Sequence, residues 1–128
     1  MSYCFSKKVS LSYEEALERA AEELKKEGFG ILTEIDVKDA LKNKLGVDFK
    51  KYKILGACNP QYAYKALQHE DKIGVMLPCN VVVEEHENGE VEVSAIDPVA
   101  SMQAVQNDAL GGIAAEVRDK LKRVIDSI

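Results

Sequence analysis

The chain has 128 residues, of which 46% are apolar, and this is enough to enclose one continuous hydrophobic core. We therefore expect a single domain over residues 1–128. The 22 acidic and 17 basic residues give a net charge of −5. A charge of this sign repels phosphate backbones and anionic lipid surfaces, so we expect no nucleic-acid partner and no membrane partner.

The first eight residues become polar too early to hold the apolar stretch of a secretory signal. The longest apolar run, residues 73–83, is shorter than the roughly 20 residues that a membrane-spanning helix needs, and Pro78 interrupts it. These features predict a soluble cytoplasmic protein, in which the three cysteines remain thiols.

The first part of the chain predicts a strand, a helix and a second strand. Residues 3–9 have the apolar content of a strand, and Ser12 with Glu15 forms a capping-box pair that starts a helix. Apolar residues then recur every three or four positions up to Gly28, which favours a left-handed helix end. Residues 29–35 are rich in apolar and β-branched side chains, which indicates a strand.

The next segment predicts two helices on either side of a third strand. Asp36 directly precedes an apolar periodic segment, which is typical of a helix N-cap, and Gly46 ends that short helix. Residues 50–57 alternate as a strand does. Asn59 and Pro60 then form a cap and first-turn pair, which predicts a helix to about residue 69.

A hairpin follows in the third quarter of the chain. Residues 73–77 are apolar and predict a short buried strand. Residues 81–86 and 91–96 flank Asn88 and Gly89, the dipeptide that most favours a tight turn between antiparallel strands.

The last part of the chain predicts a long helical region. Asp97 and Pro98 repeat the cap-and-proline arrangement, and Gly111 with Gly112 should kink or split the helix near its middle. The apolar stripe of this helix consists of Ile113, Val117, Leu121, Val124 and Ile128. The order of these elements predicts an α+β domain of two layers, with helices packed on a mostly antiparallel sheet.

Two Cys-Asn pairs, Cys58-Asn59 and Cys79-Asn80, join apolar segments to new elements and are the strongest candidates for a functional site. Cys58 directly precedes a helix start, a position that favours a reactive thiol, and Cys79 could lie close to it. The alternative is that both cysteines are small buried residues at strand ends.

Three predicted helix starts form a second candidate site. Asp36, Asn59 and Asp97 each follow the end of a strand, so their helix-start amides could gather at one sheet edge and bind an anion. The competing interpretation is that the two aspartates are ordinary caps. Asn80 has no evident duty in its strand, so its amide either binds a ligand or holds the neighbouring loop.

Other constellations are weaker. Glu34 and Asp36 share a strand face and could act as a general acid and base, whereas the alternative is that Asp36 caps and Glu34 pairs with a lysine. The spacing of the cysteines and of the two histidines matches no zinc ribbon or finger, so we expect no metal site.

Four segments in this order carry a resemblance to a known family: residues 28–36 (GFGILTEID), 54–60 (ILGACNP), 77–83 (LPCNVVV) and Asp97-Pro98. Over nearly its whole length the chain resembles the domain-of-unknown-function 302 family. The resemblance implies a compact α+β domain of the TATA-binding-protein-like class and a homodimer, and it implies no assigned activity. The family's characteristic residues fall on Glu34, Asp36, Cys58, Asn59, Pro60, Pro78, Cys79, Asn80, Asp97 and Pro98.

Three hypotheses for the function follow. The first is a module that binds a small anionic molecule at the strand ends, through Asp36, Asn59, Asn80 and Asp97. The second is a thiol-dependent enzyme or redox carrier, with Cys58, Cys79 and Glu34 as candidate catalytic residues. The third is a structural or partner-binding homodimer without chemistry. The sequence names no cofactor and leaves open whether the protein is an enzyme.

Overall fold

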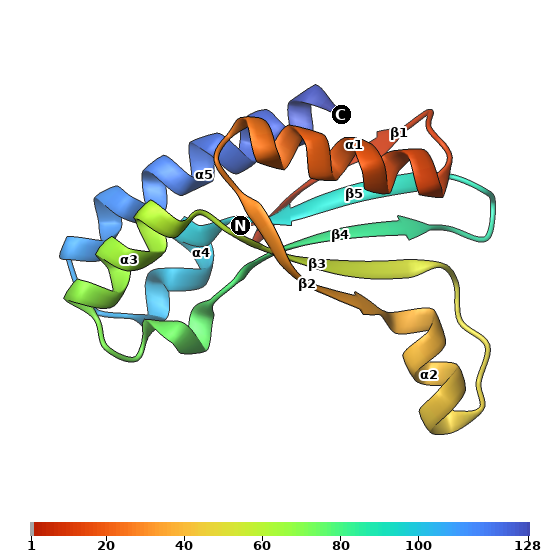
Figure 1. Ribbon diagram of the computed structural model, residues 1–128, viewed down its shortest axis with the longest axis horizontal. Coiled ribbons are helices and arrows are strands. Elements are labelled where there is room, and N and C mark those ends of the chain that lie inside the picture. The colour runs from red at the N-terminus through yellow and green to blue at the C-terminus, as the bar shows by residue number, and fades with distance from the viewer. Residues whose placement is uncertain (1) are drawn as a thin grey trace.

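The computed structural model describes residues 2–128, and within them the strands form one antiparallel five-stranded sheet of order β1-β5-β4-β3-β2 (Figure 1). The strands are β1 (Cys4–Val9), β2 (Gly30–Asp36), β3 (Tyr52–Cys58), β4 (Cys79–Glu85) and β5 (Val91–Ile96). The α-helices are α1 (Tyr13–Lys26), α2 (Val37–Leu45), α3 (Pro60–His69), α4 (Pro98–Ser101) and α5 (Ala109–Ser127). The predicted α+β class is confirmed.

The core lies between one face of the sheet and the helices α1 and α5, which run along it (Figure 1). Alternate residues of β4 and β5 are buried on this face, among them Val81, Val83 and Val93. Leu24 of α1 and Leu121 of α5 are fully buried against them. The intervening strand residues point to the opposite, open face of the sheet, where side chains are partly exposed.

The predicted helix and turn signals are present as side-chain contacts and backbone angles. The amide of Glu15 donates to Oγ of Ser12, and the amide of Ser12 donates to Oε1 of Glu15, both at 3.1 Å. Gly46 has a positive φ of 69° at the end of α2, and Gly89 has one of 87° in the hairpin turn. Both backbone conformations favour glycine because they are costly for side chains with a Cβ atom.

The strand expected at residues 73–77 is wrong, because the segment Ile73–Met76 forms a 3₁₀ helix. Its only fully buried side chain is Ile73, which packs with Ala66 and Leu110 away from the sheet, while Val75 is 85% exposed. A short apolar run does not by itself distinguish a strand from a helical turn. The next strand therefore begins only at Cys79.

The break in the C-terminal helical region also lies elsewhere than expected. α4 continues into a 3₁₀ helix at Met102–Ala104, and α5 begins at Ala109, so Gly111 and Gly112 lie inside its first turn. Asn107 lies at the break, where its Oδ1 accepts from the amide of Ala109 at 3.0 Å, a local bond that competes with helix continuation. Within residues 2–128 no helix combines the length and the apolar composition that crossing a membrane requires.

Candidate functional site

The two Cys-Asn pairs meet at one end of the sheet. β3 ends at Cys58, and the antiparallel β4 begins at Cys79, which pairs with Ala57 in the register. β5 runs antiparallel to β4 and therefore parallel to β3, so Asp97, directly after β5, lies at the same end. The convergence expected for the two Cys-Asn pairs and for two of the three helix starts is therefore present (Figure 1).

The third helix start lies at the other end of the sheet. Asp36 pairs with Lys53 in the register of β2 and β3, whereas Gly30, at the start of β2, pairs with Cys58. The Oδ1 atom of Asp36 accepts from the amide of Asp39 at 3.0 Å and so caps α2. The expectation that Asp36 shares a site with Asn59 and Asp97 is wrong, because β2 and β3 are antiparallel and their C-terminal residues lie at opposite ends of the sheet.

Glu34 belongs to the same distant part of the sheet. It lies opposite Leu55 and its side chain is exposed. Within residues 2–128 no lysine or arginine forms an ion pair with it, although a lysine partner was one of the two expectations. Because Asp36 is engaged as a cap, the acid–base pair of Glu34 and Asp36 stays a sequence prediction.

A cavity lies where the strand ends converge. Its volume, counted as the space open to the centres of water molecules, is about 40 Å³. At roughly 10–15 Å³ for each water molecule, this space holds about three. The residues that line it are Phe29, Ala57, Cys58, Asn59, Tyr62, Ala63, Ala66, Leu77, Pro78, Cys79, Pro98, Met102, Ile113, Ala114 and Val117. The lining is therefore almost wholly apolar, with two thiols, one amide and one phenol.

Asn59 connects the cavity to the end of α1 instead of capping its own helix. It occupies the N-cap position of α3, but its side chain makes no cap hydrogen bond. Its Nδ2 donates to the backbone oxygen of Glu27 at 3.2 Å. A Cβ atom at Gly28 would lie 3.1 Å from that Nδ2, and Gly28 has a φ of 88°. The first amides of α3 are therefore left without a side-chain acceptor.

The two thiols differ in their surroundings. Cys79 is buried, and this burial, followed by the charge of the neighbouring Cys58, raises the pKa of the Cys79 thiol to about 11. Cys79 is therefore protonated at neutral pH and is a poor nucleophile. Cys58 is half-buried and lines the same cavity, so it is the more accessible of the two.

Asp97 lies beside the cavity and not in its lining. Its Oδ1 accepts from the amide of Val99 at 3.0 Å, and its Oδ2 accepts from Nε of Arg118 at 3.2 Å. Both carboxylate oxygens are thus engaged, as the capping interpretation expects. Pro98, the next residue, does line the cavity.

Asn80 lies on the other face of the sheet. Its neighbour Cys79 points into the core, and successive strand residues point to opposite faces. Asn80 is exposed and borders a shallow hollow on the open face together with Tyr52 and Ser94. Asn59 lines the cavity on the core side of the sheet, whereas Asn80 lies on the open face. Their placement therefore does not support the expectation that both act on one ligand.

Sequence reasoning missed the aromatic side of the cavity. Tyr62, in the first turn of α3, lines it, and Nζ of Lys65 and of Lys120 lie 5.6 Å and 5.9 Å from its ring centroid. Burial first, and then a hydrogen bond with Glu116, raises the pKa of Tyr62. The sequence signal that could have identified Tyr62 is its position two residues after Pro60, in the first turn of a helix that begins beside Cys58. Met102, in the 3₁₀ helix after α4, lines the cavity as well.

Comparisons with known proteins agree with this architecture. The family model described as "Domain of unknown function DUF302" matches residues 5–128. A crystal structure of an uncharacterized conserved DUF302 protein from Bacillus stearothermophilus is 34% identical in sequence. Its alignment covers 99% of this chain and 98% of that chain, with a TM-score of 0.92. A comparison with curated proteins found no match. Because the family match spans nearly the whole chain, this protein belongs to the DUF302 family.

Proposed function

We propose that the protein binds a small molecule in the strand-end cavity. The observation that carries this proposal is that Cys58, which ends β3, Cys79, which begins β4, and Pro98, which follows β5, line one apolar cavity. Protein interiors are close-packed, and a concave apolar site with a few polar groups is the usual form of a ligand pocket.

The lining defines the chemistry of the ligand. Tyr62, Met102 and Ile113 offer apolar contact, and no lysine, arginine or carboxylate lines the cavity within the described residues. The uncapped start of α3 supplies free amides and the positive end of a helix dipole, which favour a small anionic group. The ligand therefore has a compact apolar body and one anionic end. Room for about three water molecules requires it to be small, or the flexible Met102 to move.

Ala63→Leu tests the cavity by filling it. Propionate, a small anion with an apolar end, should raise the melting temperature of the unchanged protein by about 4 °C at ten times its Kd. The added side chain of Ala63→Leu occupies the cavity, so this shift should disappear. The measurement is thermal unfolding followed by circular dichroism, with 1-propanol as the uncharged comparison.

Ala115→Leu is the matched control, because Ala115 is exposed on α5 beside the lining residue Ala114. It should keep the propionate shift. If propionate stabilises neither protein, or stabilises Ala63→Leu as much as the unchanged chain, the cavity proposal is wrong.

Thiol chemistry is the second candidate function, and it is favoured by the position of Cys58 beside Cys79 at one cavity. Because Cys79 holds its proton at neutral pH, Cys58 would be the attacking thiol in such a reaction. All three cysteines are free. Free thiols support the cytoplasmic location that we also propose.

A homodimer is the third element of the proposal, with α2 and β2 as its interface. α2 extends beyond the sheet (Figure 1) and has no buried residue. Leu45 at its end is 69% exposed, as is Leu32 of the edge strand β2. Exposed apolar side chains beside an unpaired edge strand favour association with a second copy.

The double substitution Leu32→Glu and Leu45→Glu should convert a dimer into a monomer, because each interface would then bury carboxylates. Size-exclusion chromatography with light scattering measures the mass directly. Leu67→Glu, on the exposed side of α3, should leave the mass unchanged. A monomeric mass for the unchanged protein at about 50 µM, where weak dimers of this kind still form, would contradict the dimer.

A further inference from the structure

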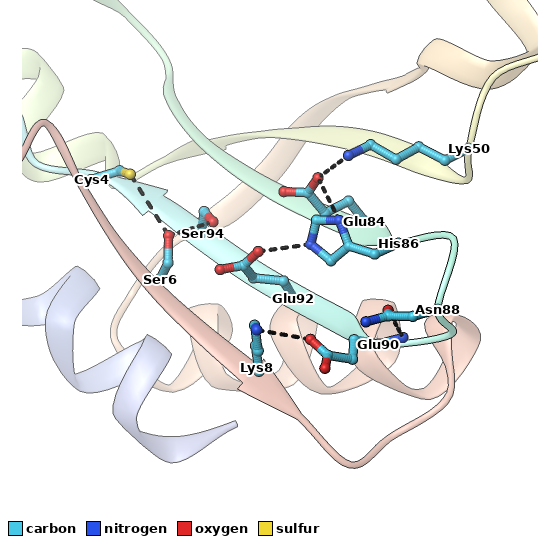
Figure 2. Close-up of polar contacts among 10 residues, drawn as sticks. All are labelled: Cys4, Ser6, Lys8, Lys50, Glu84, His86, Asn88, Glu90, Glu92 and Ser94. Atoms are coloured by element: carbon cyan, nitrogen blue, oxygen red, sulfur yellow. Dashed lines mark hydrogen bonds and ion pairs between the residues drawn. The ribbon is translucent and has the colours of Figure 1, made fainter.

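The β4–β5 hairpin brings two carboxylates and one imidazole together on the open face of the sheet. Glu84 of β4 lies directly opposite Glu92 of β5, and His86 follows Glu84 by two residues. The Nε2 atom of His86 lies 2.8 Å from Oε1 of Glu92, and its Nδ1 lies 3.9 Å from Oε1 of Glu84 (Figure 2). The three ligand atoms all lie within 4.8 Å of one another.

This arrangement concentrates negative charge. Carboxylates directly opposite each other on neighbouring strands repel. Lys50 offsets part of the charge, since its Nζ lies 2.7 Å from Oε1 of Glu84. Lys8 pairs with Glu90 at 2.8 Å, and within the described residues no lysine or arginine pairs with Glu92 (Figure 2). The cluster therefore has one ammonium for two facing carboxylates, and a dication that displaces this ammonium would balance both carboxylates.

We propose that Glu84, His86 and Glu92 bind a divalent first-row transition-metal ion such as Zn²⁺. One imidazole nitrogen with carboxylate oxygens is a ligand set that suits Zn²⁺ and its neighbours better than Mg²⁺ or Ca²⁺, which take oxygen ligands alone. In a tetrahedral zinc site the ligand atoms stand about 3.4 Å apart. The ligand atoms lie within 4.8 Å of one another, so the three side chains must move closer together to reach that spacing.

The position of the cluster on the sheet favours such a site. The side chains of Glu84, His86 and Glu92 are 15%, 31% and 23% exposed, so they are held by their surroundings yet remain open to solvent on one side. Both supporting strands belong to one hairpin in regular register. Three protein ligands leave the fourth position of a tetrahedral ion to water or to a further ligand.

Lys50 has a defined part in this proposal. Its ammonium occupies the same Glu84 oxygen that faces His86. A metal ion at the cluster must therefore displace Lys50 or bind against its charge, so Lys50 weakens metal binding. If the Lys50–Glu84 ion pair were purely structural, removing the ammonium of Lys50 would leave the metal affinity unchanged.

The test is isothermal titration of the chelator-stripped full chain with Zn²⁺. The unchanged protein should bind one ion for each chain. His86→Ala should lower the affinity at least about tenfold, as loss of groups at a metal site typically does. Lys50→Met should raise the affinity by roughly threefold or more, because a nearby positive charge repels a dication. Circular dichroism spectra establish that each variant is folded.

Two controls separate this cluster from other ligands. His69→Ala removes the other histidine, which is exposed on α3, and should leave the titration unchanged. Cys58→Ser removes the accessible cavity thiol, and should also leave it unchanged. The proposal is overturned if His86→Ala binds Zn²⁺ as tightly as the unchanged protein, if Cys58→Ser or His69→Ala abolishes binding, or if no ion binds. Unaltered binding in Lys50→Met overturns the part assigned to Lys50.

Discussion

The free energy of unfolding should fall as the pH rises above 9, and Cys79 should account for part of the fall. Its folded pKa is raised to about 11 from the ordinary value of 9.0 by burial and by the neighbouring Cys58. The unfolded chain therefore ionises this thiol first, so the stabilisation is complete below pH 9 and is lost as the pH rises toward 11. The loss is about 1 kcal/mol at pH 10 and approaches roughly 3 kcal/mol at higher pH.

Urea unfolding of the unchanged protein and of Cys79→Ala at pH 8 and pH 10 measures this contribution. The variant lacks the thiol, so its stability should fall about 1 kcal/mol less between the two pH values. Tyr13, with a pKa raised to about 12, titrates mostly above this window. Val81→Ala, a buried neighbour in β4, should lower stability equally at both pH values.

If the free energy of unfolding depends on pH equally in Cys79→Ala and in the unchanged protein, burial does not raise the pKa of the Cys79 thiol. Iodoacetamide gives a second reading, because only the thiolate reacts. The folded protein should be labelled at Cys58 well before Cys79. Labelling of Cys79 first at neutral pH would refute the order of the two thiols given by their burial.

Gly56→Ala should destabilise the protein by about 2 kcal/mol, because the added methyl group overpacks a close contact between neighbouring strands. A Cβ atom at Gly56 would collide with Oγ1 of Thr33 and would lie 2.9 Å from Cγ of Pro78. Thr33 pairs with Gly56 across β2 and β3, and Pro78 directly precedes β4, so the two obstacles come from the segments on either side of β3. The displaced Pro78 lines the cavity, which makes Gly56 a support of the site. Urea unfolding at neutral pH measures the loss.

Gly30→Ala is the matched control, because nothing lies within 4 Å of a Cβ atom placed at Gly30 in the same pair of strands. It should change stability by less than about 0.5 kcal/mol. Adding Thr33→Ala to Gly56→Ala removes the nearest obstacle and should restore about half of the loss. Equal stability of the two glycine variants would contradict the steric argument.

Local chemistry was readable from the sequence where neighbouring residues decide the outcome. Ser12 and Glu15 cap α1 as expected, and Asn88 with Gly89 forms the hairpin turn, because each device joins groups only a few residues apart. The segment at residues 73–77 was predicted wrongly for the complementary reason. An apolar run shows that a segment is buried but does not show which surface covers it.

The sequence by itself determined the α+β architecture, the helix starts and the choice of the Cys58 and Cys79 segments as the candidate site. It could do so because periodicity, caps and turns act over a few residues. Only the tertiary structure decided which of these residues meet. Strand direction places Asp97 beside Cys58 and Asp36 at the far end, and the pleat puts Asn80 on the face away from the cavity. The turn at Asn88 and Gly89 predicts the hairpin, but only the register of its two strands sets Glu84 opposite Glu92.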